Sequence, residues 1–190
     1  MKKLFLLSCC IFFASVAFAQ QFEVSEQAGA SFTNGNTRFK TSGFANLVAL
    51  GYHPLKHVEI SAFYELNKWG PANNSFGISV DYTTRHFFAG LEGKYALLTP
   101  YQVQPGFGEV IRDKYNPALG YGVHVGAKQK LVKRIWLVVQ LGYVVQPFTI
   151  ASETVSVQPA PYAYGLSFEH HNLDTGFNYL YARAGVTYRL

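Results

Sequence analysis

The sequence predicts an all-β fold, an eight-stranded antiparallel transmembrane β-barrel built as an up-and-down meander. Three observations point to it. Apolar residues recur at every second position almost throughout, which is the period of a strand with one apolar face. Aromatic residues make up 16% of the chain and charged residues only 14%, against an ordinary charged share of about 25%. Beyond the N-terminus, no apolar run approaches the roughly 20 residues of a membrane-spanning helix.

The start of the chain has the features of a secretory signal peptide. Lys2 and Lys3 precede an almost unbroken apolar run over 4–18, and small residues lie at the expected cleavage site after Ala19. This run is too short to favour a spanning anchor. We therefore expect residues 1–19 to be removed and residues 20–190 to form the barrel domain.

Charge and cysteine content exclude two further classes of protein. The chain carries 16 Lys and Arg against 11 Asp and Glu, a formal net charge of +5. Because Lys2 and Lys3 belong to the expected signal, the positive net charge of the mature chain is smaller. It is too small to indicate a nucleic-acid-binding protein. Cys9 and Cys10, the two cysteines of the chain, also lie in that signal. The mature chain would have neither disulfides nor thiol chemistry.

The first four strands are expected over 22–33, 39–52, 58–67 and 76–82. The first alternates as Gln-Ala-Gly-Ala-Ser-Phe-Thr from Gln27, and an Asn-Gly-Asn turn follows it. The second is apolar on both faces, so its facing stays open. The third alternates as Val-Glu-Ile-Ser-Ala from Val58, and the fourth as Phe-Gly-Ile-Ser-Val-Asp-Tyr from Phe76. The first, third and fourth patterns have the period of two of a strand with one apolar face.

The last four strands are expected over 87–97, 119–128, 135–146 and 177–190. They alternate in the same way, as in Leu-Gly-Tyr-Gly-Val-His-Val from Leu119 and Ile-Trp-Leu-Val-Val-Gln-Leu-Gly from Ile135. Two long loops are expected over 99–116 and 147–176. Within the second loop, 148–157 is expected to pair with 162–170 across a Pro-rich turn.

Long and short connections alternate along this series of strands. Connections are long after the first, third, fifth and seventh strands and short after the others, so both chain ends lie on one side. Transmembrane barrels place short turns in the periplasm and long loops outside. A soluble lipocalin-like barrel is the alternative. Its interior would have to hold the bulky apolar face, for which eight strands leave limited room.

The cost of a charge in lipid assigns the two faces of each strand. A Lys or Arg on the lipid face at mid-membrane costs about 2–4 kcal/mol, so charged positions within the strands are expected to point into the lumen. They are Glu59, Glu65, Asp81, Glu92, Lys94, Lys128, Arg183 and Arg189. Because carboxylates and cations interleave, we expect an internal ion-pair network with Arg183 at its centre. Inward glycines would make room for large side chains, so we expect no wide pore.

We expect no catalytic, cofactor-binding or metal-ligating residues. Interleaved opposite charges favour structural pairing over acid–base catalysis. His170 and His171 are adjacent, so on a strand they would point to opposite faces and would not readily share one metal. His53 and His57 flank an expected turn, for which a solvated turn is the simpler interpretation. His124 is expected to be a hydrogen-bonded lumen residue.

The terminal strand carries a resemblance to a known family. Apolar residues alternate over 182–190, and a final strand with an apolar face needs a partner at its edge. Together with the signal peptide, the strands and the connection lengths, the ending Val-Thr-Tyr-Arg-Leu from Val186 resembles the small OmpX/OmpA-type outer-membrane barrel-domain family. Such barrels commonly end on Phe or Trp, which the assembly machinery reads. This chain has Leu190 there, and Tyr188 would supply the aromatic ring.

The resemblance implies a monomer in the cell outer membrane, in contact with outer-membrane lipid, lipopolysaccharide and the barrel-assembly machinery. It implies a structural, adhesion or binding role through loops 99–116 and 147–176, without enzymatic activity. Two alternatives remain. A lipid-A deacylase needs His-x-Ser, whereas His170 is followed here by His171 and Asn172. A narrow porin needs a water path through the lumen.

Overall fold

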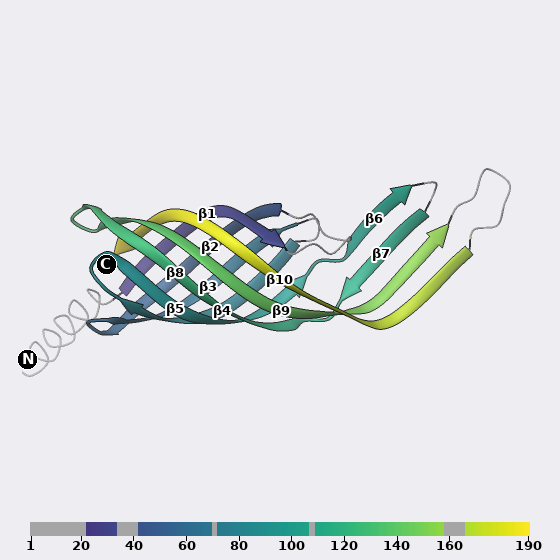
Figure 1. The fold of residues 1–190 in the computed structure, drawn as a ribbon, viewed down its shortest axis with the longest axis horizontal. Coiled ribbons are helices and arrows are strands. Elements are labelled where there is room, and N and C mark those ends of the chain that lie inside the picture. The colour runs from purple at the N-terminus through teal and green to yellow at the C-terminus, as the bar shows by residue number, and fades with distance from the viewer. Residues whose placement is uncertain (1–21, 34–41, 70–71, 107–108, 158–165) are drawn as a thin grey trace, which may run out of the picture.

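The structure, a computed structural model, describes residues 22–33, 42–69, 72–106, 109–157 and 166–190. Eight of its strands close into the expected antiparallel barrel (Figure 1). The elements are β1 (Phe22–Thr33), β2 (Ser42–Leu55), β3 (Val58–Lys68), β4 (Ala72–Thr83), β5 (Phe87–Leu98), β6 (Tyr101–Gly106), β7 (Glu109–Tyr115), β8 (Ala118–Val132), β9 (Ile135–Val157) and β10 (Leu166–Arg189). The expected signal peptide, with both cysteines, lies outside the described residues.

The terminal strand closes the barrel, as the sequence predicts. β10 pairs antiparallel with β1 from Glu23 opposite Arg189 to Thr33 opposite Tyr179. Round the barrel the strands follow the order β10-β1-β2-β3-β4-β5-β8-β9, and β9 pairs again with β10. Closure leaves no free sheet edge in the barrel wall, which removes the hazard of an unpaired strand. No helix in the described part of the chain is long and apolar enough to cross a membrane.

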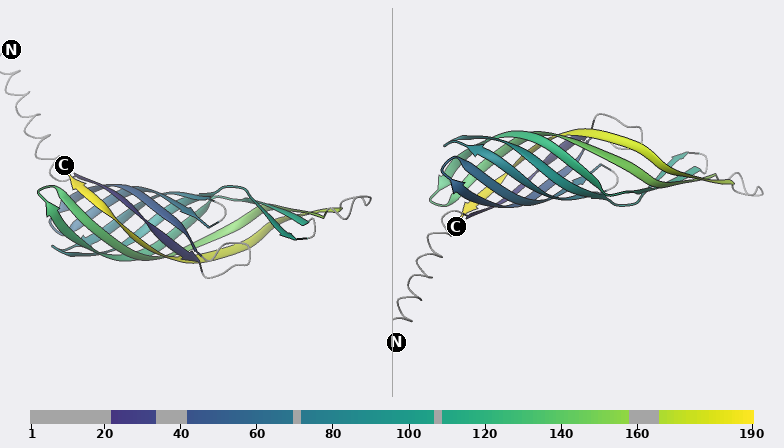
Figure 2. Two further views of the ribbon diagram at one scale, coloured as in Figure 1. Left: turned by 90° about the horizontal axis from the view of Figure 1, so that it is seen from above. Right: turned by 90° about the horizontal axis from the view of Figure 1, so that it is seen from below.

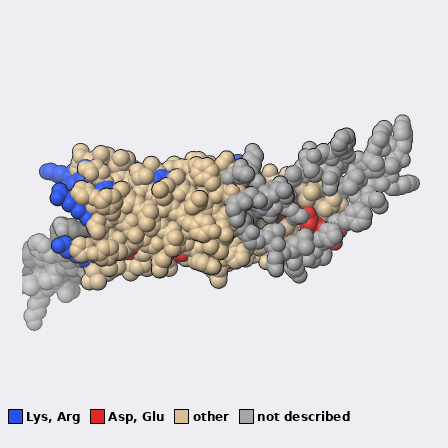
Figure 3. All heavy atoms as spheres, viewed as in Figure 1, with Lys and Arg blue, Asp and Glu red and all other residues tan. Residues whose placement is uncertain are grey.

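The alternation of each strand separates an outer apolar face from an inner polar one. On β8, Leu119 and Tyr121 are exposed while His124 and Lys128 are buried. β2, whose facing the sequence left open, turns Phe44, Val48 and Leu50 outward and buries Ala45 and Leu47. A broad middle band of the face in Figure 3 is almost free of charged side chains, whereas Lys and Arg gather at one end. The outer surface therefore suits contact with lipid.

The described part of the segment 99–116 consists mainly of the two strands β6 and β7, so the expectation of an irregular loop there is wrong. β6 pairs with β7, and β7 pairs in turn with β9, from Glu109 opposite Val157 to Tyr115 opposite Ile150. Because β7 pairs with residues 150–157 of β9, the segment forms backbone hydrogen bonds that its Pro and Gly content does not predict. Figure 1 shows this hairpin beyond the barrel wall.

The segment 147–176 is also more regular than expected. β9 and β10 continue through it as one long antiparallel pair, and Phe148 lies opposite Thr175 and Val157 opposite Leu166. The expected pairing of 148–157 with 162–170 is therefore confirmed in part, because 153–157 pairs with 166–170, whereas 148–150 pairs with 173–175. Beyond the barrel the strand order is β10-β9-β7-β6. We call this part the projecting sheet; it consists of β6, β7, residues 150–157 of β9 and residues 166–173 of β10. Both views of Figure 2 show it at the end opposite the C-terminus.

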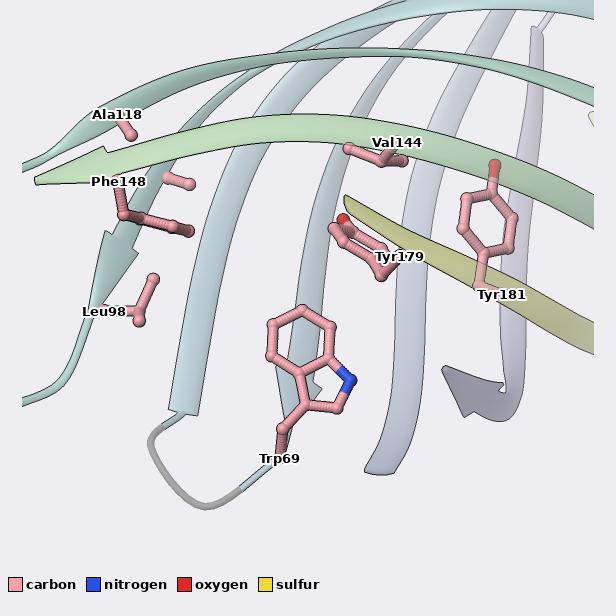
Figure 4. Packing of buried hydrophobic residues seen from close by; sticks show 8 residues of the cluster. Trp69, Leu98, Ala118, Val144, Phe148, Tyr179 and Tyr181 are labelled. Carbon is pink, nitrogen blue, oxygen red and sulfur yellow. The ribbon is translucent and has the colours of Figure 1, made fainter. Parts of the chain in front are cut away.

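An aromatic cluster fills the barrel interior near the projecting sheet (Figure 4). Its buried members are Trp69, Ala96, Leu98, Ala118, Val144, Phe148, Tyr179 and Tyr181. The rings of Trp69 and Tyr179 lie 4.9 Å apart at an interplanar angle of 60°. Large side chains thus occupy the lumen at this end, as expected for an eight-stranded barrel with a filled interior.

Candidate functional site

The deepest charged groups of the lumen form what we call the inner charge layer, made of Glu65, Glu92, Lys94 and Arg183. Lys94 forms ion pairs with Glu65 and with Glu92, whose Oε1 lies 2.9 Å from Nζ. Arg183 donates from Nη1 to Oε1 of Glu65 over 2.9 Å. Two carboxylates and two cations therefore balance within one layer, as the high cost of an unpaired buried charge requires.

Two tyrosines of β10 connect this layer to the aromatic cluster. The hydroxyl of Tyr179 accepts a hydrogen bond from Nζ of Lys94 over 2.7 Å, and the hydroxyl of Tyr181 donates to Oε2 of Glu92 over 3.1 Å. The guanidinium of Arg183 lies 3.7 Å from the centroid of the Tyr181 ring, a cation–π contact. Charge and aromatic packing thus form one continuous block across the lumen.

His124 lies next to the inner charge layer and is a buried hydrogen-bonded residue, in the position expected for it. Its Nε2 contacts a carboxylate oxygen of Asp81, and its Nδ1 lies 3.6 Å from Oε2 of Glu92. The hydroxyl of Ser79 donates to the other oxygen of Asp81 over 3.0 Å. His124 therefore links Asp81 to the inner charge layer.

A second group of charges lies where the lumen opens at the C-terminal end of the barrel, and we call it the mouth cluster. Its members are Glu23, His53, Glu59, Lys128 and Arg189. Oε2 of Glu23 accepts a hydrogen bond from Nη2 of Arg189 over 3.2 Å and lies 3.0 Å from Nε2 of His53. Oε2 of Glu59 lies 3.5 Å from Nζ of Lys128 and 3.7 Å from Nε2 of His53.

Two spaces flank the mouth cluster. Towards the inner charge layer is a small polar cavity of about 50 Å³, lined in part by Ser25, Ser61 and Gln140, a volume with room for a few waters. On the outer side is an open hollow of about 630 Å³, formed by the β2–β3 and β4–β5 turns with Trp136 and Arg189. The polar cavity thus lies between the mouth cluster and the block of inner charges and aromatic rings.

All eight charged residues expected in the lumen lie on the inward face of their strands. They form two groups at different depths of the barrel. Glu65, Glu92, Lys94 and Arg183 meet in the inner charge layer, with Asp81 beside it. Glu59, Lys128 and Arg189 belong to the mouth cluster. Lys94, which bridges two carboxylates, is more central than Arg183. The side chain of Arg189 is 37% exposed, so it lies at the rim rather than deep inside.

Sequence reasoning missed Glu23 and His53. Glu23 lies four residues before Gln27, where the regular alternation of the first strand begins, although it shares the inward phase of Ser25 and Gln27. The sequence predicts that His53 flanks a turn, whereas β2 extends to Leu55 and a register irregularity after Tyr52 precedes the turn. Extending the alternation of the first strand back to its start would have found Glu23, whereas the second strand, apolar on both faces, offers no such signal for His53. His170 and His171 lie in β10 opposite Glu153 and Ser152, and their side chains are outside the described part of the structure.

No protein-family model matches the sequence. No curated protein matches it either. Similarity to known proteins therefore comes from the backbone arrangement alone.

Solved structures with the same architecture are bacterial outer-membrane proteins. Neisserial surface protein A superimposes with a TM-score of 0.55 and 17% identity, covering 89% of this chain and 97% of that one. A major outer membrane protein from Thermus thermophilus gives 0.52 and 14%, covering 89% and 99%. The outer membrane protein OprG from Pseudomonas aeruginosa gives 0.50 and 10%, covering 88% and 95%. The chain has the fold of a small outer-membrane β-barrel.

This fold agrees with the family resemblance carried by the sequence. The aligned proteins are covered almost completely, so the likeness extends over the whole barrel rather than one hairpin. At these identities the likeness concerns the fold, and the residues of the inner charge layer and the mouth cluster must be interpreted from their own contacts.

Proposed function

We propose that this chain is a non-enzymatic barrel protein of the bacterial outer membrane that presents the projecting sheet to the exterior as a structural or adhesive surface. The observation that carries the proposal is the contrast between the two parts of the molecule. The lumen is occupied by the inner charge layer and the aromatic cluster, whereas β6, β7 and the parts of β9 and β10 beyond the barrel form a hydrogen-bonded sheet outside it. A filled barrel anchors this sheet and transports little.

The outer surface supports the membrane location. Leu119, Tyr121, Val125 and Leu141 are more than half exposed, which is costly in water and favourable in lipid. Outer-membrane lipid and lipopolysaccharide would surround the barrel. The terminal strand with Tyr188 would be read by the barrel-assembly machinery, and the closed barrel needs no second copy.

Labelling of single cysteines tests the location and the orientation. Lys114 is exposed in β7, and Lys133 is exposed in the β8–β9 turn at the opposite end. Removal of the signal peptide would also remove Cys9 and Cys10, so the introduced cysteine would be the one thiol of the mature chain. Lys114→Cys should then react with a membrane-impermeant maleimide in intact cells. Lys133→Cys, the matched control, should react only after the outer membrane is permeabilised. The reverse pattern, or equal labelling of both variants, would refute the proposed topology.

Removal of the projecting hairpin tests the adhesive role. A short Gly–Ser turn replacing residues 101–115 leaves the eight barrel strands intact, so heat-resistant migration of the folded barrel on gels should persist. Adherence of cells to protein-coated surfaces and their self-aggregation should fall to the level of cells without the protein. Unchanged adherence with a folded barrel would remove the hairpin from the proposed role.

The two alternatives have separate tests. A narrow porin would give stable single channels in planar bilayers, and nanosiemens conductance would overturn the proposal of a filled lumen. A lipid-A deacylase would remove an acyl chain, so mass spectra of lipid A from cells with and without the protein should be identical under our proposal. A mass difference of one acyl chain would make the protein an enzyme.

A further inference from the structure

Three side chains from neighbouring strands converge in the mouth cluster: Glu23 of β1, His53 of β2 and Glu59 of β3. Nε2 of His53 lies 3.0 Å from Oε2 of Glu23 and 3.7 Å from Oε2 of Glu59. One ligand atom from each of the three residues lies within 4.8 Å of the others. Two carboxylates and an imidazole thus face a common point, a donor set that a divalent cation can use.

The backbone leaves space for this approach at Gly51. Gly51 lies opposite Glu23 on one side and Ser61 on the other. A Cβ atom at Gly51 would lie 2.8 Å from Oε1 of Glu59 and 3.0 Å from Cγ of Glu23. A larger residue would therefore push the carboxylates away. The glycine makes room for the two like-charged groups to come together on the same side of the lumen.

The carboxylate of Glu59 is also oriented by a hydrogen bond from a neighbouring residue on β3. The hydroxyl of Ser61 donates to its Oε1 over 3.0 Å, while its Oε2 faces His53. Hydrogen bonds of this kind fix the orientation of carboxylate ligands in metal sites. A cation from solution has a route to the point between the three residues, because His53 lines the open hollow of the mouth.

We propose that Glu23, His53 and Glu59 form a binding site for a first-row divalent transition-metal cation, with Zn²⁺ as the representative ion. One imidazole nitrogen and two carboxylate oxygens suit Zn²⁺ and its neighbours, whereas Ca²⁺ and Mg²⁺ prefer all-oxygen ligands. Water from the mouth hollow would complete the coordination. The site is separate from the projecting sheet and does not depend on the function proposed above.

Two cations of the mouth cluster compete with the metal for the same oxygens. Nη2 of Arg189 lies 3.2 Å from Oε2 of Glu23, and Nζ of Lys128 lies 3.5 Å from Oε2 of Glu59. In the metal-free state these cations balance the carboxylates. The side chain of Arg189 is 37% exposed and has solvent beside it, whereas Lys128 is only 9% exposed. Metal binding thus displaces Arg189 in preference to Lys128, and removal of Arg189 should tighten binding.

The experiment is a Zn²⁺ titration of the refolded, chelator-stripped barrel in detergent, with a chromophoric chelator as competitor. His53→Ala and Glu59→Gln should each weaken binding about tenfold or more, since each removes one of three ligands. His57→Ala is the matched control. It removes an imidazole of the same turn whose Nδ1 contacts the carbonyl oxygen of Thr83, and the Zn²⁺ affinity should stay unchanged.

Arg189→Gln keeps the proposal testable even where a ligand variant folds poorly. It should raise the Zn²⁺ affinity about tenfold, because it removes a competing charge from Glu23 without removing a ligand. Co²⁺ should give the visible absorption of a low-symmetry site in the wild type and lose it in His53→Ala. The proposal is overturned by equal Zn²⁺ affinity in wild type and His53→Ala, which would assign binding to surface histidines. Unchanged or weaker affinity in Arg189→Gln would also overturn it.

Discussion

Arg183 on β10 donates a hydrogen bond to Glu65 on β3, with 2.9 Å between Nη1 and Oε1, although β1 and β2 lie between the two strands. Arg183 is 2% exposed and Glu65 is 0% exposed. The pair therefore links two strands that share no backbone hydrogen bonds, in an interior where charges are poorly screened. The stability of the barrel should depend on this link more than on charges at the rim.

Replacement of Arg183 tests that dependence. Arg183→Leu leaves the inner charge layer with two carboxylates and one cation, so we expect a loss of about 3 kcal/mol in the free energy of unfolding. The measurement is urea unfolding of the refolded barrel, with heat-resistant migration on gels as a second readout. Arg189→Gln is the control at the rim and should cost less than about 1 kcal/mol. Equal stability of Arg183→Leu and the wild type would remove the structural role of the layer.

A double variant separates charge balance from loss of a contact. Glu65→Gln combined with Arg183→Leu restores one carboxylate to one cation, because Lys94 keeps its ion pair with Glu92. We expect the double variant to be more stable than the sum of the two single losses implies, by about 1 kcal/mol or more. Strictly additive losses in a double-mutant cycle would mean that the two residues act independently.

Gly142 should not tolerate a side chain, because the ring of Tyr181 occupies the space beside it. A Cβ atom at Gly142 would lie 2.2 Å from Cζ of Tyr181. We expect Gly142→Ala to destabilise the barrel by about 1–3 kcal/mol through overpacking. Gly93→Ala is the matched control, because a Cβ atom there meets nothing within 4 Å. If both alanine variants unfold at the same urea concentration as the wild type, the interior is looser than the structure indicates.

The lipid-facing surface predicts a cost that depends on depth. Val123 is 53% exposed in the middle of β8, and Leu131 is 56% exposed near its end. In lipid vesicles, Val123→Arg should lose about 2–4 kcal/mol of folding free energy, whereas Leu131→Arg should lose at most about 1 kcal/mol. Equal costs at the two positions would argue that this face is not in contact with a bilayer.

Most of the barrel wall was predictable because each strand reveals its own faces. In β3, β4 and β8, apolar and polar residues alternate regularly, so a short stretch of each strand is enough to tell its two faces apart. A charge in lipid is costly whichever strand lies beside it. The projecting sheet was not predictable in the same way. The pairing of β7 with β9 joins segments about 40 residues apart, and its register depends on how far β9 extends beyond the barrel.

For the charged residues inside the lumen, too, the sequence indicates the face of each residue but not its partners. The inward phase alone indicates that Glu59, Lys94 and Arg183 point into the barrel, but it does not indicate which of them meet. Lys94 reaches Glu65 and Glu92, while Glu59 turns instead to His53 and Lys128. These partners depend on the stagger between strands, because a shift by an even number of residues moves a side chain along the barrel axis without changing its face.

The order of residues along the chain was enough to predict the number of barrel strands, the face that most of them present to the lumen and the strand that closes the barrel. These features depend on local alternation and on the cost of placing a charge in lipid, both of which are properties of single strands. The folded arrangement was needed to bring Glu23, His53 and Glu59 together, because the register between β1, β2 and β3 decides which side chains of these neighbouring strands meet. It was also needed for the sheet that the upper ends of β9 and β10 form outside the barrel, because that sheet requires β7 as a distant partner.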